Sequence, residues 1–315
     1  MLPGGGSAGA SQVGILRSLV EAGIYPDVLV GCSVGALNAA FFALDPTLEQ
    51  VERMEGLWRG LKRSSVFGTR RSGVVARVLT HRDHLWSPRT LREMLVRYCP
   101  VDDLADLRVP VEVVTTDIDN SVARWWRTGP AREILYASAC LPGLLPPAIL
   151  DGHRHVDGGV LEPAPVRHAV DLDASTVIVL GEIVGPEDEP APKLSALDVL
   201  VRSFAVSRYA RLPDPMGLAR TGQRVIVVPG ANTVGVGITD FGHTERFLAE
   251  GCERSRRFLR ETGIAGIGRI AGIGREGIGR EGIGRAIAAP APALAPAPVV
   301  RVAATRANEA LAAGA

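Results

Sequence analysis

A serine stands between two glycines where an apolar strand-like run passes directly into an apolar helix-like run. The segment is Leu-Val-Gly-Cys-Ser-Val-Gly-Ala-Leu, with Gly31 and Gly35 two residues on either side of Ser33. A turn that joins a buried strand to a helix so abruptly crowds its own backbone, and glycine at these two positions relieves the crowding. The serine of such a turn lies at a helix N-terminus, where free N–H groups favour negative charge. Ser33 is therefore a candidate nucleophile, and the alternative is a helix-capping serine followed by a packing glycine.

The early position of this turn constrains the architecture. The common hydrolase fold with a Ser, Asp/Glu, His order has several strands before its nucleophile, whereas at most one short strand fits before Ser33. None of the six histidines lies in a late loop typical of a triad. His243 comes nearest to one, but a surface or helix-start position is favoured for it. We therefore expect a different hydrolase architecture.

Strand-like and helix-like segments alternate through most of the chain. Continuous apolar runs predict strands at 27–31, 109–119, 175–182 and 224–230, and helical periodicity appears at 12–23, 48–61, 87–95 and 244–262. Strands that are apolar on both faces are typical of largely parallel sheets covered by helices. The predicted fold is therefore α/β, with three layers, a mostly parallel central sheet and helices on both faces.

The composition changes after residue 262. Residues 263–285 repeat a Gly-Ile-Gly-Arg-Glu-like unit, and an Ala/Pro-rich stretch follows. Glycine in a helix costs about 1 kcal/mol relative to alanine, and proline interrupts helices and strand ladders alike. We expect residues 1–262 to form the folded domain and 263–315 to be a disordered low-complexity tail. An alternative role for the arginines of the repeat is contact with anionic membranes.

Charge and cysteine usage restrict partners and compartment. The formal net charge is +1 at pH 7, which predicts no nucleic-acid binding. The four cysteines lack the spacing of metal sites, so reduced thiols in a reducing compartment are expected. Neither a signal peptide nor an apolar run of about 18 residues is apparent. The expectation is a cytoplasmic protein for which peripheral membrane contact stays open, and the composition does not determine its oligomeric state.

A glycine-rich segment, Gly-Gly-Gly-Ser-Ala-Gly from Gly4 to Gly9, precedes the first helix-like run. Such a turn at a helix start exposes several backbone N–H groups in one concavity, which can hold an anion. The spacing also fits a dinucleotide-binding fingerprint, which needs a preceding strand and an acidic residue at the end of the second strand. Asp27 lies at the start of the next strand instead, which disfavours the dinucleotide interpretation.

A third motif, Asp157-Gly158-Gly159, would by itself indicate an Asp-Gly turn. Together, the three motifs resemble those of the patatin-like phospholipase family over about residues 3–262. Gly4–Gly9 is similar to that family's glycine-rich oxyanion turn, and Gly31–Gly35 is similar to its GxSxG elbow. The third motif is similar to the family's DGG motif, and all three occur in the family's order.

The resemblance implies a patatin-like Ser–Asp hydrolase fold. It also implies an enzyme that cleaves acyl esters of lipids without a cofactor or metal. Ser33 would attack the ester carbonyl, and Asp157 would accept its proton. The backbone N–H groups of Gly4, Gly5 and Gly6 would hold the tetrahedral oxyanion. The expected substrate is a lipid or fatty-acyl ester.

Three features keep alternatives open. His153 and His155 alternate with Asp157 along one strand and therefore share its face, so His155 is a less favoured candidate base. Ala8 stands where the family usually has Arg or Lys, which argues against a strong preference for anionic headgroups. Only three residues precede the glycine turn, and the third is a proline without an N–H. Either the true start lies upstream, or the turn is poorly anchored and the protein is a catalytically impaired binding or regulatory protein.

Overall fold

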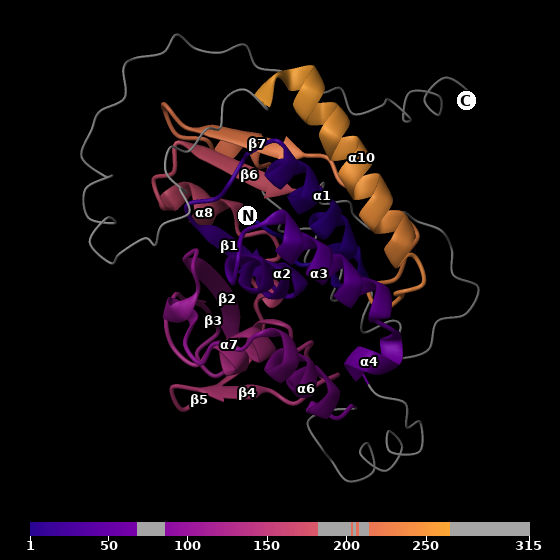
Figure 1. Ribbon diagram of the computed structural model, residues 1–315. Helices are drawn as coiled ribbons and strands as arrows, with labels where there is room; N and C mark the ends of the chain where they lie inside the picture. The colour runs from indigo at the N-terminus through magenta and orange to yellow at the C-terminus, as the bar shows by residue number, and fades with distance from the viewer. Residues whose placement is uncertain (68–85, 182–202, 204–205, 208–213, 265–315) are drawn as a thin grey trace, which may run out of the picture. The chain divides into compact units, whose positions relative to one another are not determined.

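The computed structural model describes residues 1–67, 86–181, 203, 206–207 and 214–264 (Figure 1). These residues all fall within one structural unit, Met1–Ile270. Of the expected tail, 263–315, only Gly263 and Ile264 are described. The remainder of the tail lies outside the described residues, so the domain boundary stays a prediction.

The central sheet is built around one long strand. Its members are β1 (Leu29–Cys32), β2 (Val111–Asp117), β3 (Val122–Trp126), β4 (Ala148–Leu150) and β5 (His153–Asp157), in the order β1-β2-β5-β4 with β3 also paired to β2. β1 pairs with β2 in parallel, whereas β3 and β5 pair with β2 in antiparallel fashion. A second sheet holds β6 (Thr176–Leu180) and β7 (Arg224–Val228), which are parallel.

The first two residues connect the two sheets. The Met1 nitrogen donates to Ile178 O at 2.7 Å, and the Leu180 N–H donates to Met1 O at 3.0 Å. On the other edge, the Leu2 N–H donates to Val30 O at 2.8 Å, and Leu2 pairs with Gly31 as a parallel bridge. This short segment therefore forms ladder bonds with both β6 and β1, and the Leu2 side chain is fully buried.

Helices cover both faces of this sheet system. They are α1 (Gly9–Glu21), α2 (Val34–Ala43), α3 (Leu48–Gly60), α4 (Arg63–Phe67), α6 (Arg89–Tyr98), α7 (Ala131–Ser138), α8 (Val166–Asp171) and α10 (Thr244–Thr262). Short 3₁₀ turns lie at Gly6–Ala8, Leu104–Asp106, Gly158–Val160 and Met216–Leu218. Side chains from α1, α2, α3, α7 and α10 share the main hydrophobic core. α8 lies next to β6 (Figure 1), and its side chains pack with those of β6 and β7 in a second cluster.

The α/β class and its three layers are confirmed, and the sheet is mixed rather than mostly parallel. The predicted strands became β1, β2, β6 and β7, which make the parallel pairs. The antiparallel members were harder to recognise, because β3 is partly exposed and β5 begins with His-Arg-His. Continuous hydropathy detects only strands that are buried on both faces. Among the described helices, none combines the length and hydropathy needed to cross a bilayer.

Candidate active site

Ser33 occupies a strained turn between β1 and α2. Its backbone has φ 55° and ψ −128°, a region that non-glycine residues rarely adopt and that costs about 1–3 kcal/mol. A Cβ on Gly31 would lie 2.5 Å from the Cα of Ala36, and one on Gly35 would lie 2.2 Å from Leu2 O. Glycine is therefore required on both sides of the turn, for close packing against backbone in each case.

Replacing Gly35 by alanine is expected to lower the free energy of unfolding by about 3 kcal/mol or more, because the added Cβ meets backbone that cannot rotate away. Urea denaturation of the variant and the wild type measures this difference. The matched control is Gly56→Ala in α3, where a Cβ meets nothing within 4 Å. That control is expected to gain up to about 1 kcal/mol from helix propensity. Equal losses for the two variants would contradict the packing argument.

A buried serine from another helix supports the turn. The Ser33 N–H donates to Ser138 Oγ at 3.0 Å, and Ser138 Oγ in turn donates to Val114 O at 2.7 Å. Ser138 ends α7 and is fully buried. This chain of bonds ties the elbow to β2. Sequence reasoning missed Ser138, since nothing in its local pattern distinguishes it from any small helix-end residue.

The sheet register brings the aspartate to the serine. Along one edge of β2, β1 ends with Cys32 opposite Val114, and β5 ends with Asp157 opposite the next residue, Thr115. The two strands approach this point from opposite directions, so their ends meet. The Ser33 Oγ donates to Asp157 Oδ2 at 2.5 Å, and both side chains are buried.

The aspartate is held by the two glycines that follow it and by the chain around it. Its Oδ1 accepts the Gly159 N–H at 2.7 Å, and its own N–H donates to Cys140 O at 2.8 Å. A Cβ on Gly158 would lie 2.4 Å from Val114 O, so a side chain there would push the turn away from β2. The Asp-Gly-Gly segment therefore fixes the carboxylate with one oxygen toward Ser33.

The glycine-rich turn is anchored at several points along its length. The Gly4 N–H donates to Pro163 O at 2.9 Å, and the Ser7 N–H donates to Ile238 O at 2.9 Å. Gly6 has φ +58°, and a Cβ there would lie 2.1 Å from Ile238 O. Gly4, Gly5 and Gly6 were the expected oxyanion donors. The Gly4 N–H is already bonded to Pro163 O, which leaves the N–H groups of Gly5 and Gly6 as candidates. Within the described residues, the N–H groups of Gly5, Gly6 and Val34 have no acceptor.

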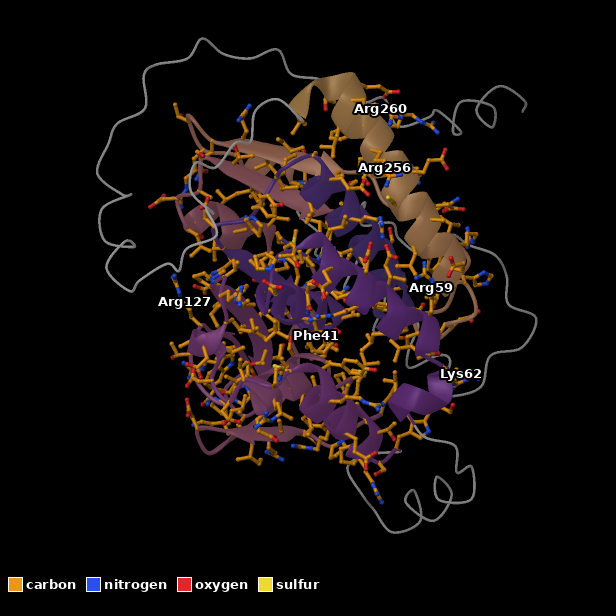
Figure 2. The ribbon with its side chains drawn as sticks, in the orientation of Figure 1. Phe41, Arg59, Lys62, Arg127, Arg256 and Arg260 are labelled. Atoms are coloured by element: carbon orange, nitrogen blue, oxygen red, sulfur yellow. The ribbon has the colours of Figure 1, made fainter. Side chains whose placement is uncertain are left out.

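An apolar pocket opens beside Ser33. Its lining also includes Gly6, Val34, Leu37, Asn38, Phe41, Leu57, Trp58, Leu61, Val66, Leu91, Met94, Ala139, Leu141, Ile238 and Phe241. Its volume of about 80 Å³ is several times the roughly 10–15 Å³ that one water needs. Phe41, labelled in Figure 2, lies in the interior, whereas the labelled Arg59 and Arg256 lie on outer helix surfaces and pair with glutamates. The pocket thus suits an uncharged hydrocarbon chain.

Residues 1–170 match the family model described as patatin-like phospholipase. The chain belongs to the patatin-like phospholipase family. It is 31% identical over 191 residues to patatin-like phospholipase domain-containing protein 7 of Rattus norvegicus, across 60% of this chain and 14% of that protein. It is 30% identical over 191 residues to patatin-like phospholipase domain-containing protein 6 of Homo sapiens, across 60% of this chain and 13% of that protein. Lysophospholipase nte1 of Aspergillus terreus is 27% identical to it over 237 residues, across 72% of this chain and 15% of that protein.

The chain therefore spans about a seventh of the length of these relatives. Within the patatin-like match lie both Ser33 and Asp157, whereas Ile238 and Phe241, which wall the pocket, lie beyond it. The roles of individual residues rest on their geometry.

The two histidines considered as bases, His155 and His243, contact other groups in this patatin-like domain. His155 Nδ1 lies 2.9 Å from Thr115 Oγ1, which also accepts the Trp126 Nε1–H at 2.8 Å. Burial lowers the pKa of His155 below its usual value, so its neutral form is favoured. His243 precedes the first residue of α10, with Nε2 3.7 Å from Asp240 Oδ2, which agrees with the expected helix-start position.

A group of possible metal ligands lies at the end of β2, where atoms of Asp117, Asp119 and His153 come within 4.8 Å of one another. Asp117 accepts the side-chain amide of Asn120 at 2.8 Å, and this bond is the main reason that its pKa falls to about 2. Asp119 pairs with Arg154. Both carboxylates are thus already engaged by protein donors, and nothing in the group points to an ion.

Proposed function

We propose that this chain is a serine lipid acyl hydrolase in which Ser33 is the nucleophile and Asp157 is the proton acceptor. The observation that carries the proposal is the 2.5 Å hydrogen bond from Ser33 Oγ to Asp157 Oδ2 beside an apolar pocket. A hydroxyl bonded to a buried carboxylate can lose its proton to that carboxylate as it attacks an ester carbonyl. No histidine is needed for this transfer.

The reaction proceeds in two halves. The Ser33 oxygen bonds to the ester carbonyl carbon while its proton passes to Asp157, and the resulting oxyanion faces the N–H groups of Gly5, Gly6 and Val34. Collapse breaks the bond to the alcohol, which leaves with the proton from Asp157. A water then gives a proton to Asp157 and attacks the acyl-serine, which releases the fatty acid and returns the proton to Ser33.

The apolar lining indicates the substrate class. An acyl chain in the pocket would contact Leu37, Phe41 and Leu57, which favours fatty-acyl esters such as lysophospholipids, in line with the name of the fungal relative. Such substrates are presented by micelles or bilayers, so peripheral contact with a lipid surface is part of the proposal.

The alternative is a binding or regulatory protein with an impaired site. That hypothesis depended on a poorly anchored glycine turn. The ladder bonds of residues 1–2 and the bond from Gly4 to Pro163 favour an anchored turn instead. An active hydrolase is therefore the better supported of the two functions.

The test combines turnover with mapping of the nucleophile. The purified chain is incubated with lysophosphatidylcholine, with diacyl phosphatidylcholine and with p-nitrophenyl butyrate, and released fatty acid is measured by mass spectrometry. In parallel, a fluorophosphonate adduct is located by peptide mapping. Fatty acid release together with an adduct on Ser33 supports the proposal. An adduct on another serine, or lipid binding without turnover, contradicts it.

A further inference from the structure

Two buried amide side chains bracket the glycine-rich turn. Gln12 Nε2, from α1, donates to Pro3 O at 2.7 Å just before the turn, and Asn38 Nδ2, from α2, donates to Gly9 O at 2.9 Å just after it. Gln12 is 5% exposed and Asn38 is 1% exposed. The two amides therefore hold both ends of the glycine-rich segment, of which Gly6 lines the pocket.

The two amides also bond to each other and to an indole. Asn38 Nδ2 donates to Gln12 Oε1 at 3.0 Å, and Trp58 Nε1 donates to Asn38 Oδ1 at 3.0 Å. Every N–H and the oxygen of the Asn38 amide thus have a partner. The Gln12 amide is engaged at its nitrogen by Pro3 O and at its oxygen by Asn38. Because donors and acceptors face matching partners, these bonds favour one orientation of each buried amide.

The position of Asn38 couples this network to the nucleophile. Asn38 lies in α2, and Ser33 is the residue that immediately precedes this helix. The bond from Asn38 to Gly9 O therefore sets the spacing between the elbow helix and the glycine turn. A misplacement of about 1 Å between reacting groups can cost about 100-fold in rate. Burying two amides costs desolvation free energy that two leucines would not. A need to fix the spacing between the two segments would account for that cost.

We propose that Gln12 and Asn38 are positioning residues, which hold the oxyanion turn of Gly5 and Gly6 at its working distance from Ser33. The inference rests on the proposed function. Neither amide takes part in the chemistry. Their effect is on where the oxyanion donors lie, so their loss should weaken binding of the transition state more than binding of the substrate.

The test uses Gln12→Met and Asn38→Leu, which keep side-chain volume and remove the amides. We expect kcat to fall about 10- to 100-fold with KM changed by less than about 3-fold. Affinity for a trifluoromethyl ketone, whose adduct mimics the oxyanion, should fall by the same factor as kcat. The double variant should lose less than the product of the two single losses, because the amides act as one network.

The matched control is Gln50→Met. Gln50 is also a buried amide, and its Nε2 donates to Phe41 O at 2.6 Å without touching the glycine turn. It should lose thermal stability as the test variants do, yet keep wild-type kcat and ketone affinity. Gln12→Met leaves the bonds from Asn38 to Gly9 and from Trp58 to Asn38 in place. If Asn38→Leu does not fold, the kcat and ketone affinity of Gln12→Met alone test the inference.

Unchanged kcat in the folded test variants would overturn the inference, and so would an equal loss of kcat in Gln50→Met. A rise in KM with kcat preserved would overturn it too, since that pattern reports lost substrate contacts. An active wild type with unaffected variants overturns this inference alone. A wild type that releases no fatty acid overturns the proposed function, and this inference with it.

Discussion

Replacement of Ser33 by alanine is expected to lower kcat/KM for ester hydrolysis by about 10⁴-fold or more and to abolish fluorophosphonate labelling. The variant removes the attacking oxygen, which is the hydroxyl that donates to Asp157 Oδ2 in the structure. Ser138, the nearby hydroxyl of the support chain, donates to Val114 O and accepts from the Ser33 N–H. The measurement is fatty acid release from lysophosphatidylcholine, with circular dichroism to confirm the fold.

The control for this variant is Ser18→Ala. Ser18 is a buried serine of α1 that bonds to Ile15 O and lies 2.7 Å from Ser255 Oγ, on contacts that do not involve the pocket. It is expected to cost about 1 kcal/mol of stability and to leave hydrolysis and labelling unchanged. Labelling that persists in Ser33→Ala would identify a different nucleophile and contradict the assignment.

Local patterns in the sequence predicted the elements that are buried on both faces and the long amphipathic helices. The helix expected at 244–262 has the bounds of α10, and the strand expected at 224–230 contains β7. α7 was missed although it contributes Ser138. The helix expected from Ser87 begins at Arg89 instead, with Pro88 at the capping position. Hydropathy reports burial, so it does not register strands such as β3 that are partly exposed.

The pairing of the serine with the aspartate could not be derived from local patterns. It depends on two strands that share one edge of β2, with Cys32 and Asp157 at consecutive register positions. Register is set by tertiary packing across more than a hundred residues of chain, and nothing near Ser33 encodes it. The sequence pointed to the pair only through its resemblance to a family whose motifs occur in this order.

The anchoring of the glycine turn shows the same limit. Three residues before the turn appeared too few to hold it, because a sequence shows the length of a strand and not its partners. The partners are distant in the chain: Pro163 bonds to Gly4, and Ile238 bonds to Ser7. Ile238 lies outside residues 1–170, which match the family model, so the glycine turn is completed by a part of the chain that the family model does not cover.

Replacement of Asp157 by asparagine is expected to lower kcat by about 10⁴-fold while the fold and substrate binding are kept. Asparagine has nearly the same shape, and its carbonyl oxygen can still accept a hydrogen bond in place of the carboxylate. It cannot take the Ser33 proton, so attack on the ester and the later activation of water both lose their base. Steady-state hydrolysis, with KM measured alongside kcat, checks this result. The control is Asp119→Asn, which removes a partly exposed carboxylate paired with Arg154 and should leave kcat unchanged.

The same variant decides between the two candidate bases. His155 lies on the same face of β5 as Asp157, and its Nδ1 is occupied by Thr115 Oγ1 in the structure. If Asp157 is the base, His155→Gln should retain most of the wild-type kcat, and Asp157→Asn should lose nearly all of it. The reverse pattern would transfer the role of base to His155. In that case the 2.5 Å hydrogen bond between Ser33 and Asp157 would only orient the serine hydroxyl. An amide can replace a carboxylate in such a role at little cost in rate, because no proton has to be taken up.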